Sequence, residues 1–186
     1  MYASLVQMVN AAANDLQLTA SSSRRYVSVQ VDAAWGCAGQ NNVYQGVERD
    51  FSDFPFMQAL GLSSYPYFVF TDPDEVPLDY YSRLPNGRSL PVMVVEGGWT
   101  SGAAGAIVSS PEKQARYIRH QAWMLDSVHA RAVFHLTFTD LDTASLNLPP
   151  GSILPLFASL GLVDVDLRPK VALAVWDSLF VLPRTP

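Results

Sequence analysis

The sequence predicts an α/β fold in which parallel strands alternate with helices. Apolar residues recur at helical spacing in several segments, and short runs rich in β-branched residues lie between them. The clearest short run, 90–96, is almost continuously apolar, which is typical of a parallel strand buried on both faces. Strands that alternate with helices along a chain indicate βαβ units. No linker or tandem repeat divides the 186 residues, so we expect one domain over 1–186.

The first half of the chain is expected to begin with an amphipathic helix, because Leu5, Val9, Ala12 and Leu16 follow helical spacing. A polar run then leads into residues that alternate as in a strand. The predicted elements are a helix over 2–18, a strand over 26–31, a loop over 32–36, a polar loop with room for a short helix over 40–53, a short helix over 54–60, a strand over 61–66 and a helix over 77–84.

The second half contains the clearest helix start. Ser110 can cap the helix with its side chain, and Pro111 suits the first helical position. The predicted elements are a strand over 90–96, a helix from 110, a strand over 132–138, a short helix over 153–160 and a last helix from about 169. The two halves together give about four strands with flanking helices.

Composition excludes several classes of partner. The net charge is −5 and the basic residues are dispersed, so no basic surface for nucleic acid is expected. No apolar run reaches the roughly 20 residues of a membrane helix, and no signal peptide is visible, which leaves the compartment unknown. The single cysteine, Cys37, cannot form an internal disulfide, and no metal or phosphate-binding motif occurs. We therefore expect no cofactor.

Polar and aromatic residues follow each of the four predicted strands. In parallel βα folds the functional residues lie at the carboxyl ends of the strands. The residues found there are Asp32 and Trp35; Ser63, Ser64 and Tyr65; Glu96 and Trp99; and Asp140 and Asp142. This repeated placement predicts an active face at one edge of the sheet.

Glu96 is the strongest candidate for a catalytic residue among these positions. A carboxylate placed directly after an apolar strand is costly near a core, which makes it a candidate for chemistry. The alternative is a glutamate that reaches solvent or pairs with an arginine.

Three segments carry a resemblance to a known family. Residues 94–99 (Val-Val-Glu-Gly-Gly-Trp) resemble the seventh strand of the clan-A retaining glycoside hydrolases. Residues 61–66 (Gly-Leu-Ser-Ser-Tyr-Pro) resemble the sixth strand, especially of the galactanase-like members, and residues 138–140 with 168–176 resemble the eighth strand and last helix. The resemblance implies half of a (β/α)8 barrel, with 1–186 corresponding to strands five to eight.

The resemblance also implies roles for individual residues. Glu96 takes the position of the nucleophile, which attacks the anomeric carbon while a second carboxylate serves as acid and base. Tyr65 resembles the tyrosine that hydrogen-bonds the nucleophile, with Tyr67 as the competing candidate. The other substrate-binding positions expected at the rim are Trp35 and Trp99, which would stack on sugar rings, and Ser64 and Asp32.

The chain departs from the family in one respect. The family carries its acid/base glutamate in an Asn-Glu pair after the fourth strand, and no Asn-Glu dipeptide occurs here. The first predicted helix matches the one after strand four, so strands one to four are expected to be missing. Asp140 is the preferred substitute carboxylate; the others are Asp32, Asp72 and Asp142.

Half a barrel would leave sheet edges and apolar strand faces in water, including Val29, Val92, Val94 and Phe134. We therefore expect a homodimer, or association with a missing amino-terminal half. Two other functions remain open. One is an ester hydrolase that uses Ser64 or Ser101 with His135, although a core role is the preferred reading of this histidine. The other is a non-catalytic fragment that binds sugars through Trp35 and Trp99 or binds a missing amino-terminal half. For an enzyme, the expected partner is a carbohydrate or another small-molecule substrate.

Overall fold

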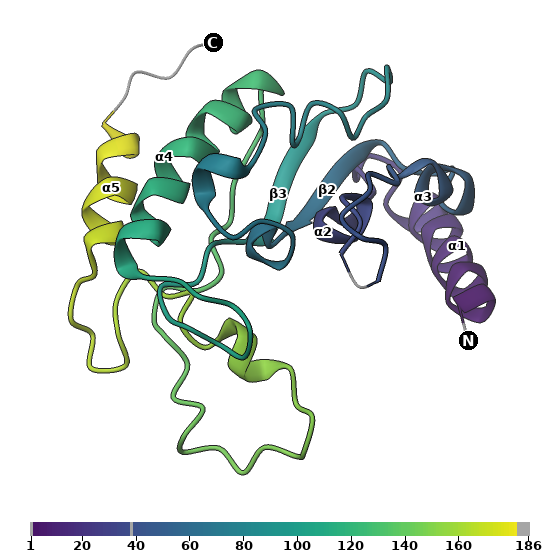
Figure 1. The fold of residues 1–186 in the computed structure, drawn as a ribbon. Helices are drawn as coiled ribbons and strands as arrows, with labels where there is room; N and C mark the ends of the chain where they lie inside the picture. The colour runs from purple at the N-terminus through teal and green to yellow at the C-terminus, as the bar shows by residue number, and fades with distance from the viewer. Residues whose placement is uncertain (1, 38, 182–186) are drawn as a thin grey trace.

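The computed structural model describes residues 2–37 and 39–181, and within them three parallel strands form one sheet (Figure 1). The strands are β1 (Tyr26–Gln30), β2 (Ala59–Ser64) and β3 (Val92–Gly97), and they lie in that order across the sheet. Both neighbouring pairs run parallel, which confirms the predicted α/β fold with parallel strands.

The fourth predicted strand, 132–138, forms only in part. The segment lies beside β3, where Phe134 N donates to Val94 O (2.9 Å) and Leu136 N donates to Gly97 O (2.8 Å). A parallel bridge joins Val94 to Val133, but no continuous ladder follows. The prediction of a regular strand here is therefore wrong, although the segment does lie where a fourth parallel strand would.

Three of the predicted helices, over 2–18, from 110 and from about 169, are present in the structure. The helices are α1 (Tyr2–Thr19), α2 (Val31–Ala34), α3 (Glu48–Asp53), α4 (Pro111–Ser127) and α5 (Val171–Phe180), with 3₁₀ turns η1 (Pro66–Phe68), η2 (Pro73–Glu75) and η3 (Leu154–Phe157). The predicted helix over 77–84 is a run of turns, the predicted helix over 54–60 runs into β2, and the predicted loop over 32–36 begins inside α2.

One face of the sheet is covered by helices. Val29 and Val94, from β1 and β3, are buried in the same core as Tyr117 and Met124 of α4. Figure 1 shows α4 and α5 side by side at one end of the sheet, and α1 and α3 at the other end. The prediction that the strand valines meet water is thus wrong, because their side chains point into the helix layer.

The opposite face of the sheet is more open. Tyr26, Ser28 and Gln30 of β1 are exposed and alternate with residues that point toward the helices. Phe134 is 58% exposed, whereas its neighbour Val133 packs against the core on the helix side. Within the described ranges, no helix is both long and apolar enough to cross a membrane.

Candidate functional site at the carboxyl edge of the sheet

Glu96 and Ser63 face each other across β2 and β3. An irregularity between Leu62 and Ser63 shifts the register, so that Ser63 lies opposite Glu96 and Ser64 lies opposite Gly97. The Ser63 hydroxyl donates a hydrogen bond to Glu96 Oε1. Glu96 is half-buried at the carboxyl end of its strand, which is where the sequence places a functional carboxylate.

Tyr65 lies beside the same carboxylate. Burial is the main cause that raises the pKa of the Tyr65 hydroxyl well above its usual value. The negative charges of Glu96 and Asp32, and a hydrogen bond between the hydroxyl and Glu96, raise this pKa further. Tyr65 remains a protonated donor at neutral pH, as the role expected for it requires.

Asp32 is buried behind Tyr65, with 4% of its surface exposed. Its carboxylate accepts hydrogen bonds from Gln30 Nε2 (2.8 Å) and from Cys37 Sγ (3.3 Å), and the backbone of Tyr65 also hydrogen-bonds to it. Burial raises the pKa of Asp32, while these three hydrogen bonds oppose that rise. Burial and the neighbouring Asp32 together raise the pKa of the Cys37 thiol to about 12, so this thiol stays protonated.

Gly97 allows the two strands to approach closely. Its φ is +152°, and a Cβ at this position would lie 2.3 Å from the carbonyl oxygen of Ser64. A side chain would therefore push β3 away from β2, and would move Glu96 with it.

The predicted sugar-stacking residues lie inside the protein. Trp35 stacks on Tyr80 with ring centroids 5.2 Å apart, and its indole N–H donates to the Tyr80 carbonyl (3.1 Å). Trp99 is 1% exposed, packs against Tyr117, and donates to Ser109 Oγ (3.0 Å). Both indoles find apolar cover and a hydrogen-bond acceptor in the core, so neither offers a ring face at the rim.

Tyr67 and Ser64 are also directed away from Glu96. The Tyr67 hydroxyl donates to the carbonyl of Leu156 (3.2 Å), and the ring is buried. Ser64 Oγ lies 3.0 Å from the hydroxyl of Tyr81 on the helix side of the sheet. Of the two tyrosines considered as the partner of Glu96, Tyr65 is the one beside it.

The serines and histidine of the ester-hydrolase alternative have other partners. Ser101 Oγ donates to the carbonyl of Ser159 (2.9 Å) and accepts from Lys170 Nζ (2.8 Å). His135 Nε2 lies 2.8 Å from the carbonyl of Leu160, and burial lowers the pKa of this imidazole. No hydrogen bond links His135 to Ser64 or Ser101, and the core role preferred for the histidine agrees with its burial.

Asp140 forms an ion pair instead of facing Glu96. Its Oδ1 lies 2.5 Å from Lys170 Nζ and accepts from the backbone N–H of Gly161 (2.9 Å). The side chains of Asp140 and Lys170 are only 15% and 11% exposed. These contacts tie the segment after 138 to the loop before α5, and they give the aspartate a complete structural role.

Ser63 is a residue of the site to which the sequence analysis gives no role. Alternation places Ser63 and Ser64 on opposite faces, but the register shift decides which of them lies opposite Glu96.

Among the described residues, no group of three or more His, Cys, Asp or Glu side chains could hold a metal ion. A hollow of about 460 Å³, lined in part by Phe51, Met57 and Arg88, lies at the amino ends of the strands, away from Glu96.

Comparison with solved structures finds part of a glycosidase fold. The β-glucuronidase of Ruminococcus gnavus in complex with uronic deoxynojirimycin superposes with a TM-score of 0.54 at 17% identity, over 82% of this chain and 25% of that one. The same organism's enzyme in complex with uronic isofagomine gives 0.51 at 20% identity, over 68% and 23%. The Faecalibacterium prausnitzii β-glucuronidase gives 0.50 at 22% identity, over 70% and 23%.

The chain therefore spans about a quarter of the length of these enzymes. Identities this low show a shared fold alone. No family model matches the sequence, and no curated protein sequence matches it either. The resemblance to galactanase-like enzymes in particular stays a prediction.

Proposed function

We propose that this chain is a glycoside-hydrolase-like protein of the retaining type, with Glu96 as the nucleophile. The observation that carries the proposal is a half-buried carboxylate at the carboxyl end of a parallel strand, held by the hydroxyls of Ser63 and Tyr65. A carboxylate fixed in this way is suited to attack an anomeric carbon and form a glycosyl-enzyme intermediate. The fold shared with part of several β-glucuronidases supports the same proposal.

The proposal requires a second carboxylate. A retaining mechanism places it about 5–5.5 Å from the nucleophile, where it protonates the leaving oxygen and later activates water. Asp140 is held by Lys170, and Asp32 is buried behind Tyr65, so neither is free to move toward a substrate. Asp72 is paired with Arg116, and Asp142 lies on an exposed loop, where it accepts from the backbone N–H of Ser145. We therefore assign the acid/base to a partner, either a second copy of the chain or a separate amino-terminal half.

A panel of 4-nitrophenyl glycosides tests the proposed activity. The panel includes the β-D-glucuronide and the β-D-galactoside, together with short-chain 4-nitrophenyl esters. We expect hydrolysis of at least one glycoside, because an activated leaving group needs little help from a general acid. Release of nitrophenol from esters alone would exclude the glycosidase and favour the second candidate. No release from the whole panel would favour a binding fragment without catalysis.

Ester hydrolysis is the second candidate function, and one contact favours it. Because the Ser63 hydroxyl donates to Glu96, the carboxylate could take its proton while Ser63 Oγ attacks an ester carbonyl carbon. The proton would then pass to the departing alkoxide, and water would hydrolyse the acyl-serine. The low exposure of Ser63, 5%, argues against this reading.

We also propose that the chain forms a homodimer through the open face of the sheet. Phe134 and Tyr26 are 58% and 47% exposed, and β1 and the 132–138 segment present free strand edges. Light scattering after gel filtration should give twice the 20.4 kDa mass of one chain. Phe134→Glu should give the monomer mass, since it puts a charge within the proposed interface.

Leu78→Glu is the matched control for this prediction. Leu78 is 55% exposed and lies in the turns between η2 and β3, two residues after Val76, whose carbonyl contacts His120 of α4. It should leave the mass unchanged. A wild-type chain that stays monomeric and folded at high concentration would contradict the dimer.

A further inference from the structure

We infer that Ser63 is a positioning residue that holds the Glu96 carboxylate in its reactive orientation. The inference rests on the proposed function of Glu96 as nucleophile. Two hydroxyls reach this carboxylate, one from Ser63 at the end of β2 and one from Tyr65 two residues later. Residues two apart on an extended chain point to the same side, so both donors converge on one group.

The register shift between Leu62 and Ser63 is what brings the serine to this position. It aligns Ser63 with Glu96 and Ser64 with Gly97, whose missing side chain lets β3 approach the Ser64 carbonyl. Ser63 is 5% exposed, so its hydroxyl has little access to water and donates to the carboxylate instead. A hydrogen bond from a neutral donor to a charged acceptor is stronger than one between neutral groups.

This hydrogen bond restricts the rotation of the Glu96 side chain, so that the carboxylate keeps one orientation toward the substrate. Tyr65 hydrogen-bonds Asp32 through its backbone, and Ser63 lies in β2 between β1 and β3, so the structure holds both donors in place.

The matched pair Ser63→Thr and Ser63→Val tests the inference. Threonine keeps the hydroxyl. Valine has nearly the same shape as threonine but lacks the hydroxyl, so the two variants have similar steric effects on the strand. On the best glycoside of the panel, Ser63→Val should lower kcat roughly 10- to 100-fold with little change in KM, since a hydrogen bond to a charged group is lost. Ser63→Thr should restore kcat to nearly the wild-type value, because it restores the hydroxyl.

A readout without substrate separates this inference from the proposed function. Carbon-13 NMR of protein labelled at glutamate carboxyls reports on Glu96 at one neutral pH, with its resonance identified as the one lost in Glu96→Gln. Ser63→Val should change the chemical shift of that carboxyl carbon, since it removes a hydrogen bond to the group, and Ser63→Thr should leave it close to wild type. If the chemical shift changes but no glycoside is hydrolysed, the positioning contact stands and the proposed function fails.

Two results would overturn the inference. One is equal behaviour of the threonine and valine variants in both kcat and the chemical shift of the Glu96 carboxyl carbon. The other is an acyl group found on Ser63 by mass spectrometry after reaction with a 4-nitrophenyl ester, which would make the serine the nucleophile.

Discussion

Glu96→Gln should lower kcat/KM for the best aryl glycoside by at least about 10³-fold, which corresponds to about 4 kcal/mol of lost transition-state stabilisation. The amide is nearly isosteric with the carboxylate and can still accept from Ser63 and Tyr65, so the fold should survive. It lacks the negative charge and nucleophilic oxygen that a covalent mechanism needs. Steady-state kinetics, with circular dichroism to confirm folding, measures the effect.

Glu112→Gln is the control for this prediction. Glu112 lies in the exposed first turn of α4, and it should keep wild-type kinetics. A 2-deoxy-2-fluoro glycoside with a dinitrophenyl leaving group gives an independent check, since it should label Glu96 covalently in the wild-type protein. Wild-type activity in Glu96→Gln, or a label on a different residue, would remove this carboxylate from the mechanism.

The second large effect is expected on stability, at the Asp140–Lys170 ion pair. Asp140→Asn or Lys170→Met should each lower the free energy of unfolding by about 3 kcal/mol, because each leaves the remaining charge buried without its partner. The pair is little exposed, and Asp140 also accepts a hydrogen bond from the backbone N–H of Gly161. Urea unfolding followed by tryptophan fluorescence measures the loss.

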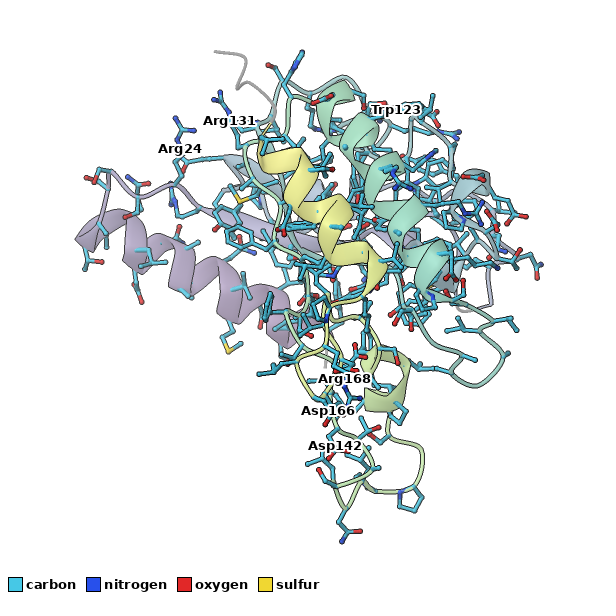
Figure 2. The ribbon with its side chains drawn as sticks, turned by 90° about the vertical axis from the view of Figure 1, so that its left-hand side faces the viewer. Arg24, Trp123, Arg131, Asp142, Asp166 and Arg168 are labelled. Carbon is cyan, nitrogen blue, oxygen red and sulfur yellow. The ribbon has the colours of Figure 1, made fainter. Side chains whose placement is uncertain are left out.

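A double variant and an exposed ion pair complete the experiment. Asp140→Asn with Lys170→Met should lose less than the sum of the two single changes, because no unpaired charge remains. Asp166→Asn breaks the exposed pair with Arg168, labelled in the lower part of Figure 2, and should lower the free energy of unfolding by about 0.5 kcal/mol or less. If Asp140→Asn lost activity but kept its stability, Asp140 would take part in the reaction instead of serving only in the ion pair.

The position of Glu96 could be predicted from the sequence because its signal is local. An apolar strand followed by a carboxylate and two glycines fixes both the element and its end. The start of α4 was equally local, since Ser110 accepts from the backbone N–H of Lys113 as the capping pattern implies. Asp32 and Tyr65 were also located near the site by strand-end reasoning.

The surroundings of Glu96 could not be predicted in the same way. Trp35 and Trp99 follow strands, but they turn into the core, where Tyr80 and Tyr117 cover them. That outcome depends on contacts with residues distant in sequence. The helix predicted over 77–84 failed for a similar reason, since Tyr80, Tyr81 and Leu84 reach the core from successive turns.

The register shift makes the direction of the Glu96 side chain depend on one extra residue of β3, Val95, which has no partner in β2. In a regular ladder Ser63 would lie opposite Val95 and Ser64 opposite Glu96, so the carboxylate would turn toward the layer that holds Tyr81. A single unpaired residue thus keeps the acidic group out of the apolar layer.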